Sequence, residues 1–225
     1  MAAIGNTSDN RDMQLKPSFF NRKAENVARS LLGKVLMHRY RGHWLAARII
    51  ETEAYYLDEK GSHASLGYTE KRRALFMPAG TIYMYCTRGK GSFNVSCRGK
   101  GNAVLIKSAF PLENQPAASL KLMHQLNPTP SGDMRAIEKL CAGQTLLCRA
   151  LDIKVKQWDQ QAFDAQRLYI NDTDYQPDKI IQARRLGIPE GRDEHLLLRY
   201  IDQHYAKYCT KNPLTRRGDK HYQLL

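Results

Sequence analysis

The sequence predicts a single compact α+β domain, in which helices surround a mainly antiparallel, curved β-sheet. The 225 residues are enough for one large core, and 42% of them are hydrophobic. Segments with strand patterns are separated by short turns, which favour antiparallel pairing. Neither a repeat nor an interdomain linker is evident in the sequence. We therefore expect a flexible N-terminal tail at residues 1–15 and one domain at residues 16–225.

The first part of the chain predicts a helix followed by two strands. Residues 20–32 place their apolar side chains on one helical face. Residues 34–40 and 44–55 have strand patterns and are joined by a short turn. If the second strand stays regularly extended, alternate side chains share a face, and that face changes from apolar to acidic along the strand. The residues on it would be Leu45, Ala47, Ile49, Glu51, Glu53 and Tyr55.

The remaining elements are predicted from shorter patterns. A long loop at residues 56–79 precedes three strands that are separated by glycine-rich turns. Three helices and then three weaker strands follow. The predicted strands cover residues 81–86, 92–97, 103–110, 167–171, 180–187 and 196–202, and the predicted helices cover residues 117–126, 133–141 and 143–151.

The chain is strongly basic, and the positive charge is concentrated. The formal net charge is +13, and residues 71–112 contain eight Lys or Arg side chains but no Asp or Glu. A charge run is usually a solvated surface. Here, glycines that allow close backbone approach and aromatic rings that can stack on bases are interleaved with the charges, which favours nucleic-acid binding. The aromatic residues in question are Tyr83, Tyr85 and Phe93.

The cysteine pattern and the hydropathy exclude several classes of protein. There are five cysteines and no Cys-x-x-Cys pair, which argues against a disulfide framework and against a zinc site. We therefore expect a reducing compartment and no structural zinc. The polar N-terminal segment lacks the apolar core of a secretion signal, and no apolar run approaches the roughly 20 residues of a membrane span, so we expect no membrane partner.

An acidic segment interrupts this basic chain. Residues 49–59 contain Glu51, Glu53, Asp58 and Glu59 and no Lys or Arg. A carboxylate at a strand end beside a polyanion-binding surface suggests chemistry on a nucleic acid: it can activate water and offset positive charge once a base has left the stack. A carbohydrate hydrolase that uses the Glu51–Glu53 pair is an alternative, which the basic, tyrosine-rich setting does not favour.

Seven segments, in order, resemble one enzyme family. They are RIIETEAY, SHAS, FMPAGTIYMY, FNVSC, AVLIKSAFPLE, LCAGQTLLCRALDI and ARRLGI. Together they resemble the alkyladenine (3-methyladenine) DNA glycosylases, with a collinear match from about Leu31 to Ile188. The resemblance implies a monofunctional enzyme of base excision repair, without a metal or cofactor, that flips alkylated or deaminated purines out of double-stranded DNA and hydrolyses the N-glycosidic bond with a Glu-activated water.

The resemblance also implies roles for individual residues. Glu53 matches the general base that activates water. Tyr55 and Tyr85 match the two stacking walls of the base pocket. His63 matches the histidine that hydrogen-bonds the flipped nucleotide, and Asn94 matches the asparagine that disfavours the exocyclic amine of guanine. We expect the DNA-binding residues to be Arg88, Lys90, Arg98, Lys100 and Lys107.

Two positions depart from the family pattern. The loop that carries the bulky wedge is shorter by one residue, and Arg88 is its candidate wedge or else a phosphate contact. Lys107 stands where the family has Arg, so it offers a point charge without a bidentate fork. The alternative function is a non-catalytic nucleic-acid-binding module that retains the fold. We expect a monomer, located in the cytoplasm and associated with the nucleoid in a bacterium, or in the nucleus of a eukaryote.

Overall fold

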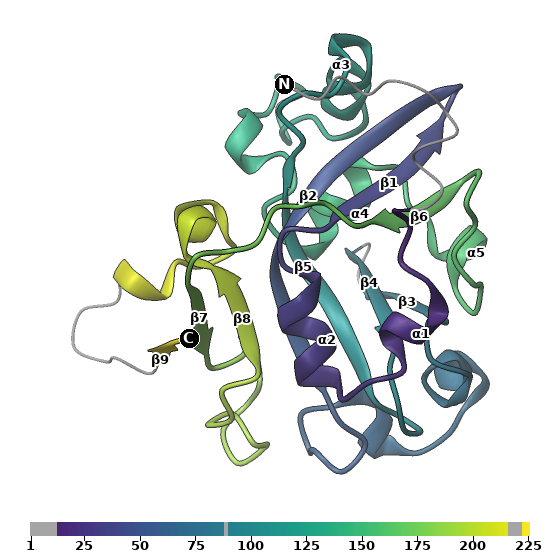
Figure 1. The fold of residues 1–225 in the computed structure, drawn as a ribbon, viewed down its shortest axis with the longest axis vertical. Helices are drawn as coiled ribbons and strands as arrows, with labels where there is room; N and C mark the ends of the chain where they lie inside the picture. Colours follow the sequence, from purple (N-terminus) through teal and green to yellow (C-terminus); the bar gives the residue numbers. More distant parts are fainter. Residues whose placement is uncertain (1–12, 88–89, 216–221) are drawn as a thin grey trace.

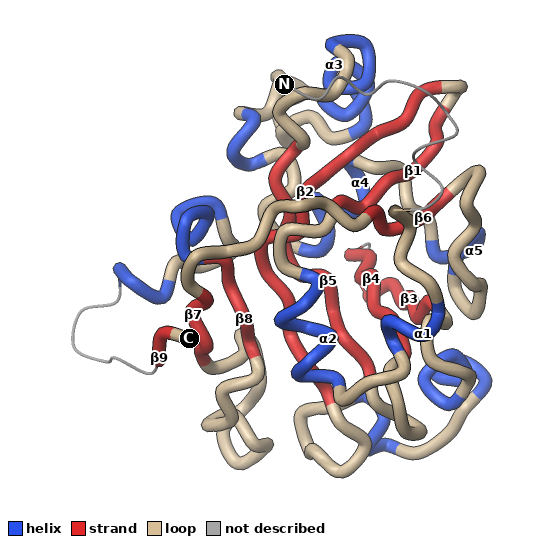
Figure 2. Tube along the Cα trace, viewed as in Figure 1, coloured by secondary structure: helices blue, strands red, loops and turns tan. Residues whose placement is uncertain are grey.

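The computed structural model describes residues 13–87, 90–215 and 222–225. Within these residues, nine strands form one sheet whose pairings are all antiparallel, and helices pack around it, so the predicted α+β fold is confirmed (Figures 1 and 2). The order along the sheet is β3-β4-β5-β2-β8-β7-β9, and β1 pairs with both β2 and β6. The strands are β1 (Val35–Tyr40), β2 (His43–Tyr55), β3 (Ile82–Thr87), β4 (Lys90–Ser96), β5 (Ala103–Pro111), β6 (Leu168–Asn171), β7 (Ile180–Ala183), β8 (Arg199–Asp202) and β9 (Tyr222–Leu224).

Short helices cover the sheet and close its core. Helix α2 lies against β2 and β5, as Figure 1 shows, and α4 packs on β4 and β5. The buried residues of α2 recur at helical spacing, which explains why this amphipathic segment is helical. The α-helices are α1 (Pro17–Phe20), α2 (Ala24–Leu31), α3 (Ala117–Leu126), α4 (Gln144–Ala150) and α5 (Val155–Trp158), and the 3₁₀-helices are η2 (His63–Leu66), η3 (Glu70–Phe76), η4 (Ile137–Lys139), η5 (Gln203–Tyr208) and η6 (Pro213–Thr215).

The pairing of β2 with β5 is irregular at one point, and this irregularity positions the acidic residues. The register passes over Ile50 on β2 and Lys107 on β5, which leaves each of them without a partner on the other strand. The expected alternation is therefore wrong beyond Ile49, because Ala54 rather than Glu53 shares the main core with Ile49. Bulges of this kind redirect side chains and are frequent beside active sites.

One helix prediction and one loop prediction need correction. The predicted helix at residues 133–141 is wrong: only η4 is helical there. Asp133 N donates to Thr129 Oγ1, and Ser131 Oγ donates to the Asp133 carboxylate, so local side-chain bonds replace the first helical turn. The predicted loop at residues 56–79 instead contains the 3₁₀-helices η2 and η3.

The glycine-rich turn between β4 and β5 lies against the segment before η2. Gly101 has a φ of +81°, and a Cβ at this position would lie 2.8 Å from Leu57 Cδ1 and 3.0 Å from Ala64 Cβ. A side chain would therefore be strained and would also push this segment away. The glycine allows residues 57–64 to form one side of a pocket.

The N-terminal segment is described only from Met13. Gln14 forms an isolated antiparallel bridge with Asn171, and Leu15 N donates to Ile170 O. This segment therefore lies alongside β6. Residues 1–12 of the expected tail lie outside the described residues. Among the described residues, we find no helix with the length and apolar character required for a membrane span.

Candidate active site

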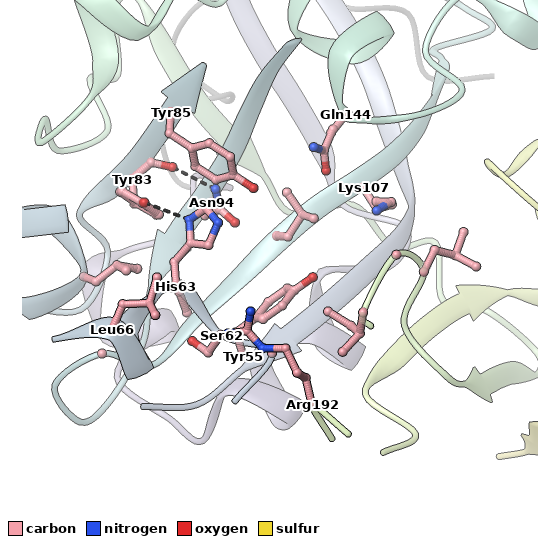
Figure 3. A pocket seen from close by; sticks show the side chains of 18 of the residues that line it. Tyr55, Ser62, His63, Leu66, Tyr83, Tyr85, Asn94, Lys107, Gln144 and Arg192 are labelled. Carbon is pink, nitrogen blue, oxygen red and sulfur yellow. Dashed lines mark hydrogen bonds between the residues drawn. The ribbon is translucent and has the colours of Figure 1, made fainter. Parts of the chain in front are cut away.

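Alternation along β3 and β5 separates a pocket from the core. Tyr85 and Leu105 line the pocket, whereas their neighbours Met84 and Ile106 belong to the main core. The pocket has a volume of about 360 Å³, and η2 and the segment after β7 complete its wall (Figure 3). The predicted residues that line it are Tyr55, His63, Tyr85, Asn94 and Lys107.

His63 and two tyrosines form one aromatic side of the pocket. The His63 ring centroid lies 4.4 Å from that of Tyr85, and His63 Nδ1 is 3.2 Å from the Tyr83 hydroxyl. Burial lowers the pKa of His63, and the positive charges of Arg72 and Arg192 lower it further. The imidazole is therefore neutral at pH 7 and can donate one hydrogen bond and accept another.

Asn94 is held in one orientation at the pocket wall. Its Nδ2 donates to Tyr83 O at 3.1 Å and to Ser92 Oγ at 3.4 Å. The residue is buried and comes from the middle of β4, directly opposite Tyr83 in the ladder. Because the strand backbone fixes this amide, Asn94 is a rigid part of the pocket surface.

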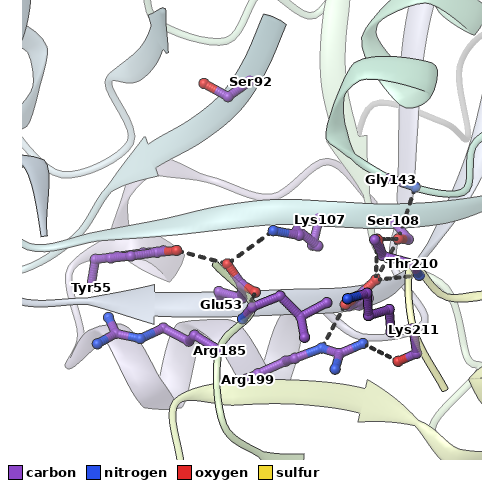
Figure 4. Close-up of polar contacts among 12 residues, drawn as sticks. Glu53, Tyr55, Ser92, Lys107, Ser108, Gly143, Arg185, Arg199, Thr210 and Lys211 are labelled. Atoms are coloured by element: carbon purple, nitrogen blue, oxygen red, sulfur yellow. Dashed lines mark hydrogen bonds and ion pairs between the residues drawn. The ribbon is translucent and has the colours of Figure 1, made fainter. Parts of the chain in front are cut away.

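Glu53 lies beneath the pocket and is fully buried. Its Oε2 accepts a hydrogen bond of 2.7 Å from the Tyr55 hydroxyl and lies 3.5 Å from Lys107 Nζ, while its Oε1 accepts a bond of 3.3 Å from Leu186 N (Figure 4). Tyr55 and Lys107 both line the pocket. Two pocket side chains therefore connect this buried carboxylate to the pocket.

The Tyr55 hydroxyl is a fixed donor in this arrangement. Burial raises the pKa of Tyr55 well above its ordinary value, and the charge of Glu53 and the hydrogen bond to it raise this pKa further. Arg185 acts in the opposite direction, but as a smaller contribution. Tyr55 therefore remains a neutral phenol that donates to Glu53 at physiological pH.

The predicted DNA-binding residues fall in different places. Lys107 belongs to the pocket, with its Nζ near Glu53 and its side chain only 12% exposed. Arg98 and Lys100 are exposed on the turn between β4 and β5, whose Gly101 lines the pocket. Arg88 lies outside the described residues, and for Lys90 only the backbone pairing with Thr87 is described.

Several residues of the site carry no signal in the sequence that would reveal them. Gln144 at the start of α4 and Arg192 after β7 both line the pocket, as Figure 3 shows.

Tyr83, which the sequence offers as a stacking residue, also lines the pocket. Phe93, the third aromatic residue offered for stacking, is fully buried in the main core, so this expectation is wrong. Because successive side chains of a strand point to opposite faces, Tyr83 on β3 faces the pocket and Phe93 on β4 faces the core.

Glu51 is a structural carboxylate. Its Oε1 accepts a hydrogen bond of 2.6 Å from Arg199 Nε, and its Oε2 accepts bonds from Ser108 Oγ and from Thr210 N. Glu51 is fully buried and Arg199 is 2% exposed. Because these partners come from β5, β8 and the segment after η5, Glu51 joins three parts of the chain.

Residues 13–87, 90–215 and 222–225 contain no group of three or more His, Cys, Asp or Glu side chains that could hold a metal ion.

Comparison with known proteins places the chain in a family. The sequence model described as methylpurine-DNA glycosylase matches residues 18–206. The chain belongs to this family. It is therefore a DNA glycosylase, a hydrolase of N-glycosyl bonds that acts on DNA in repair.

Relatives from bacteria and from a mammal support this assignment. A Pseudomonas aeruginosa protein named "Putative 3-methyladenine DNA glycosylase" is 58% identical over 94% of this chain and 90% of its own length. A relative from Pseudomonas savastanoi with the same name is 58% identical over 91% of this chain and 92% of its own length. The Mus musculus "DNA-3-methyladenine glycosylase" is 37% identical over 66% of this chain and 45% of its own length.

Proposed function

We propose that this DNA glycosylase is monofunctional and hydrolyses the N-glycosidic bond of alkylated or deaminated purines, such as 3-methyladenine, in double-stranded DNA. The damaged nucleotide leaves the stack and enters the pocket between Tyr55 and Tyr85. The pocket volume of about 360 Å³ lies within the range of roughly 300–1,000 Å³ that small-molecule sites occupy. The names of the relatives support 3-methyladenine as a substrate.

The position of Glu53 carries this proposal. A water molecule, deprotonated by Glu53, forms the new bond to the anomeric carbon, and the carbon–nitrogen bond breaks with its electron pair going to the base. An N3- or N7-alkylated purine already carries positive charge, so it leaves as a neutral base without a strong general acid. This step requires a water molecule beside Glu53 Oε2, the carboxylate oxygen that lies 3.5 Å from Lys107 Nζ at the pocket.

The pocket walls would hold the base before the bond breaks. The tyrosine rings attract a cationic purine through their electron-rich faces. His63 is neutral, so it does not repel such a base and can hydrogen-bond the flipped nucleotide. Asn94 is fixed by Tyr83 O, and an additional exocyclic amine at that position would meet a rigid amide.

The basic residues around the pocket would contact the DNA backbone. The protein would bind DNA as a monomer. Arg98 and Lys100 are exposed beside Gly101 at the pocket, which is a suitable place for phosphate contacts. From the sequence alone, we also propose Arg88 and Lys90 as contacts of the DNA backbone. Lys107 has a different role, because its charge faces Glu53 and balances that buried carboxylate.

The first prediction concerns the reaction product. A bifunctional glycosylase forms a Schiff base between an amine and the sugar and then cuts the strand. Lys107 is the amine nearest to Glu53 among the described contacts, but the proposed route uses water. We therefore expect intact abasic strands and no covalent protein–DNA adduct after borohydride treatment, for the wild type and for Lys107→Arg. A trapped adduct that disappears in Lys107→Arg would contradict the hydrolytic mechanism.

A further inference from the structure

Arg185 lies behind Tyr55, on the side away from the pocket. Its guanidinium carbon is 4.6 Å from the centroid of the Tyr55 ring. Tyr55 lines the pocket and Arg185 does not, so the ring separates the guanidinium from the space where a base would stack. Figure 4 shows Arg185 beside Tyr55, next to β2.

The anchoring of Arg185 indicates more than a structural clamp. The residue is 4% exposed, and its Nη1 donates to Ala54 O and to the Glu59 carboxylate. Within the described part of the chain, its Nε and Nη2 have no hydrogen-bond partner. Leaving buried donors without partners is costly, and the contact with the Tyr55 ring offsets part of this cost.

Two ion pairs therefore flank the Tyr55 ring. Glu53 and Lys107 lie at its hydroxyl end, and Arg185, which is paired with Glu59, lies over one face of the ring. A guanidinium on one face draws electron density away from the other face and also repels a positive charge placed there. Glu59 offsets that repulsion. A neutral purine stacked on Tyr55 is affected little by either charge.

We propose that the Arg185–Glu59 pair, acting through the ring of Tyr55, sets the preference of the pocket between cationic and neutral damaged bases. This inference rests on the proposed function, because it assumes that a flipped purine stacks on Tyr55. Arg185 touches no substrate in this arrangement, so it is a specificity-determining residue and not a catalytic one. Removing its charge favours cationic bases, whereas removing the charge of Glu59 disfavours them.

The test compares two lesions in otherwise identical duplexes. Single-turnover release of 3-methyladenine, which is cationic in DNA, is measured against release of hypoxanthine, which is neutral. We expect the ratio of the two rates to rise by about three- to tenfold in Arg185→Gln and to fall by a similar factor in Glu59→Gln. Arg185→Lys keeps the charge and should stay close to the wild type. Differences in base shape cancel, because every variant is compared on the same two duplexes.

The outcomes separate this inference from the function on which it rests. If both bases are released and the ratio is the same in all four proteins, or moves in the same direction in Arg185→Gln and Glu59→Gln, the charge role of the pair is overturned. A structural role alone would slow both reactions equally. If Arg185→Gln does not fold, the nearly isosteric Glu59→Gln still tests the inference. The ratio of cationic to neutral base release should then fall in Glu59→Gln, and an unchanged ratio would overturn the charge role. Release of neither base by the wild type would instead contradict the proposed function.

Discussion

Replacing Glu53 with Gln should lower base release at least about 100-fold, on the scale of general-base contributions of roughly 10²–10⁴. The amide has nearly the shape of the carboxylate but cannot take a proton from water. It can still accept a hydrogen bond from Tyr55, so we expect the fold and the affinity for undamaged duplex to persist. Single-turnover release of a methylated purine from duplex DNA measures this effect.

Asp58 offers a matched control for Glu53. It belongs to the same acidic segment but is exposed, so Asp58→Asn removes the same charge without changing a buried contact. We expect near wild-type release from Asp58→Asn. Release by Glu53→Gln above about a hundredth of the wild-type rate would exclude Glu53 as the general base.

Of the substitutions considered, Arg199→Met should cause the largest loss in the free energy of unfolding. It leaves Glu51 as a buried carboxylate without its cation, and breaking a buried pair from one side costs about 3–5 kcal/mol. The free energy of unfolding from urea titration at pH 7 measures the loss. Because the stranded charge causes it, adding Glu51→Gln to Arg199→Met should recover part of the stability.

An exposed ion pair provides the comparison for Arg199. Arg73 lies 3.8 Å from Glu70 with a side chain that is 54% exposed, so Arg73→Met should change the free energy of unfolding by about 0–1 kcal/mol. Equal losses for the two variants would mean that Glu51 does not depend on Arg199 for its burial. No recovery in the double variant would also contradict the stranded-charge explanation.

The acidic segment shows what the sequence can and cannot predict. Its Glu residues all lie buried against cations from distant parts of the chain, and Asp58 is its one exposed acidic residue. The three Glu side chains of this segment therefore form buried ion pairs and do not make up a negatively charged surface. Neither the pairing nor the burial has a local signal, because the partners lie 54 to 148 positions away in the sequence. The pairs are Glu51–Arg199, Glu53–Lys107 and Glu59–Arg185.

Strand periodicity explains most of the successful predictions of structure. The strands near residues 81–86 and 103–110 occur as expected, and alternation correctly separates Tyr85 from Met84. It fails in β2, because a residue left out of the ladder at Ile50 reverses the faces beyond it. A bulge is set by packing between strands, so the pattern of one strand does not reveal it. The resemblance to a family, and not the strand pattern, singles out Glu53 as the candidate general base.

Helix prediction failed at two short segments, where tertiary packing or local side-chain bonds decide the structure. The four-residue helix α5 has no amphipathic stripe long enough to be recognised, and it forms because buried Trp158 packs in the main core. The segment that follows α3 has helix-forming residues, but side-chain bonds around Asp133 stabilise a turn instead. Short helices of this kind depend on their surroundings more than on intrinsic propensity.

The most direct test of the account is release of free base by the wild-type protein. Duplex DNA carrying radiolabelled methyl groups on its purines is incubated with excess protein, and the soluble products are separated by chromatography. We predict that 3-methyladenine appears as the free base until this lesion is exhausted, while the strands remain unbroken. Binding of this DNA with all of the label retained in the strands would contradict the account and would favour a module that binds DNA without catalysis.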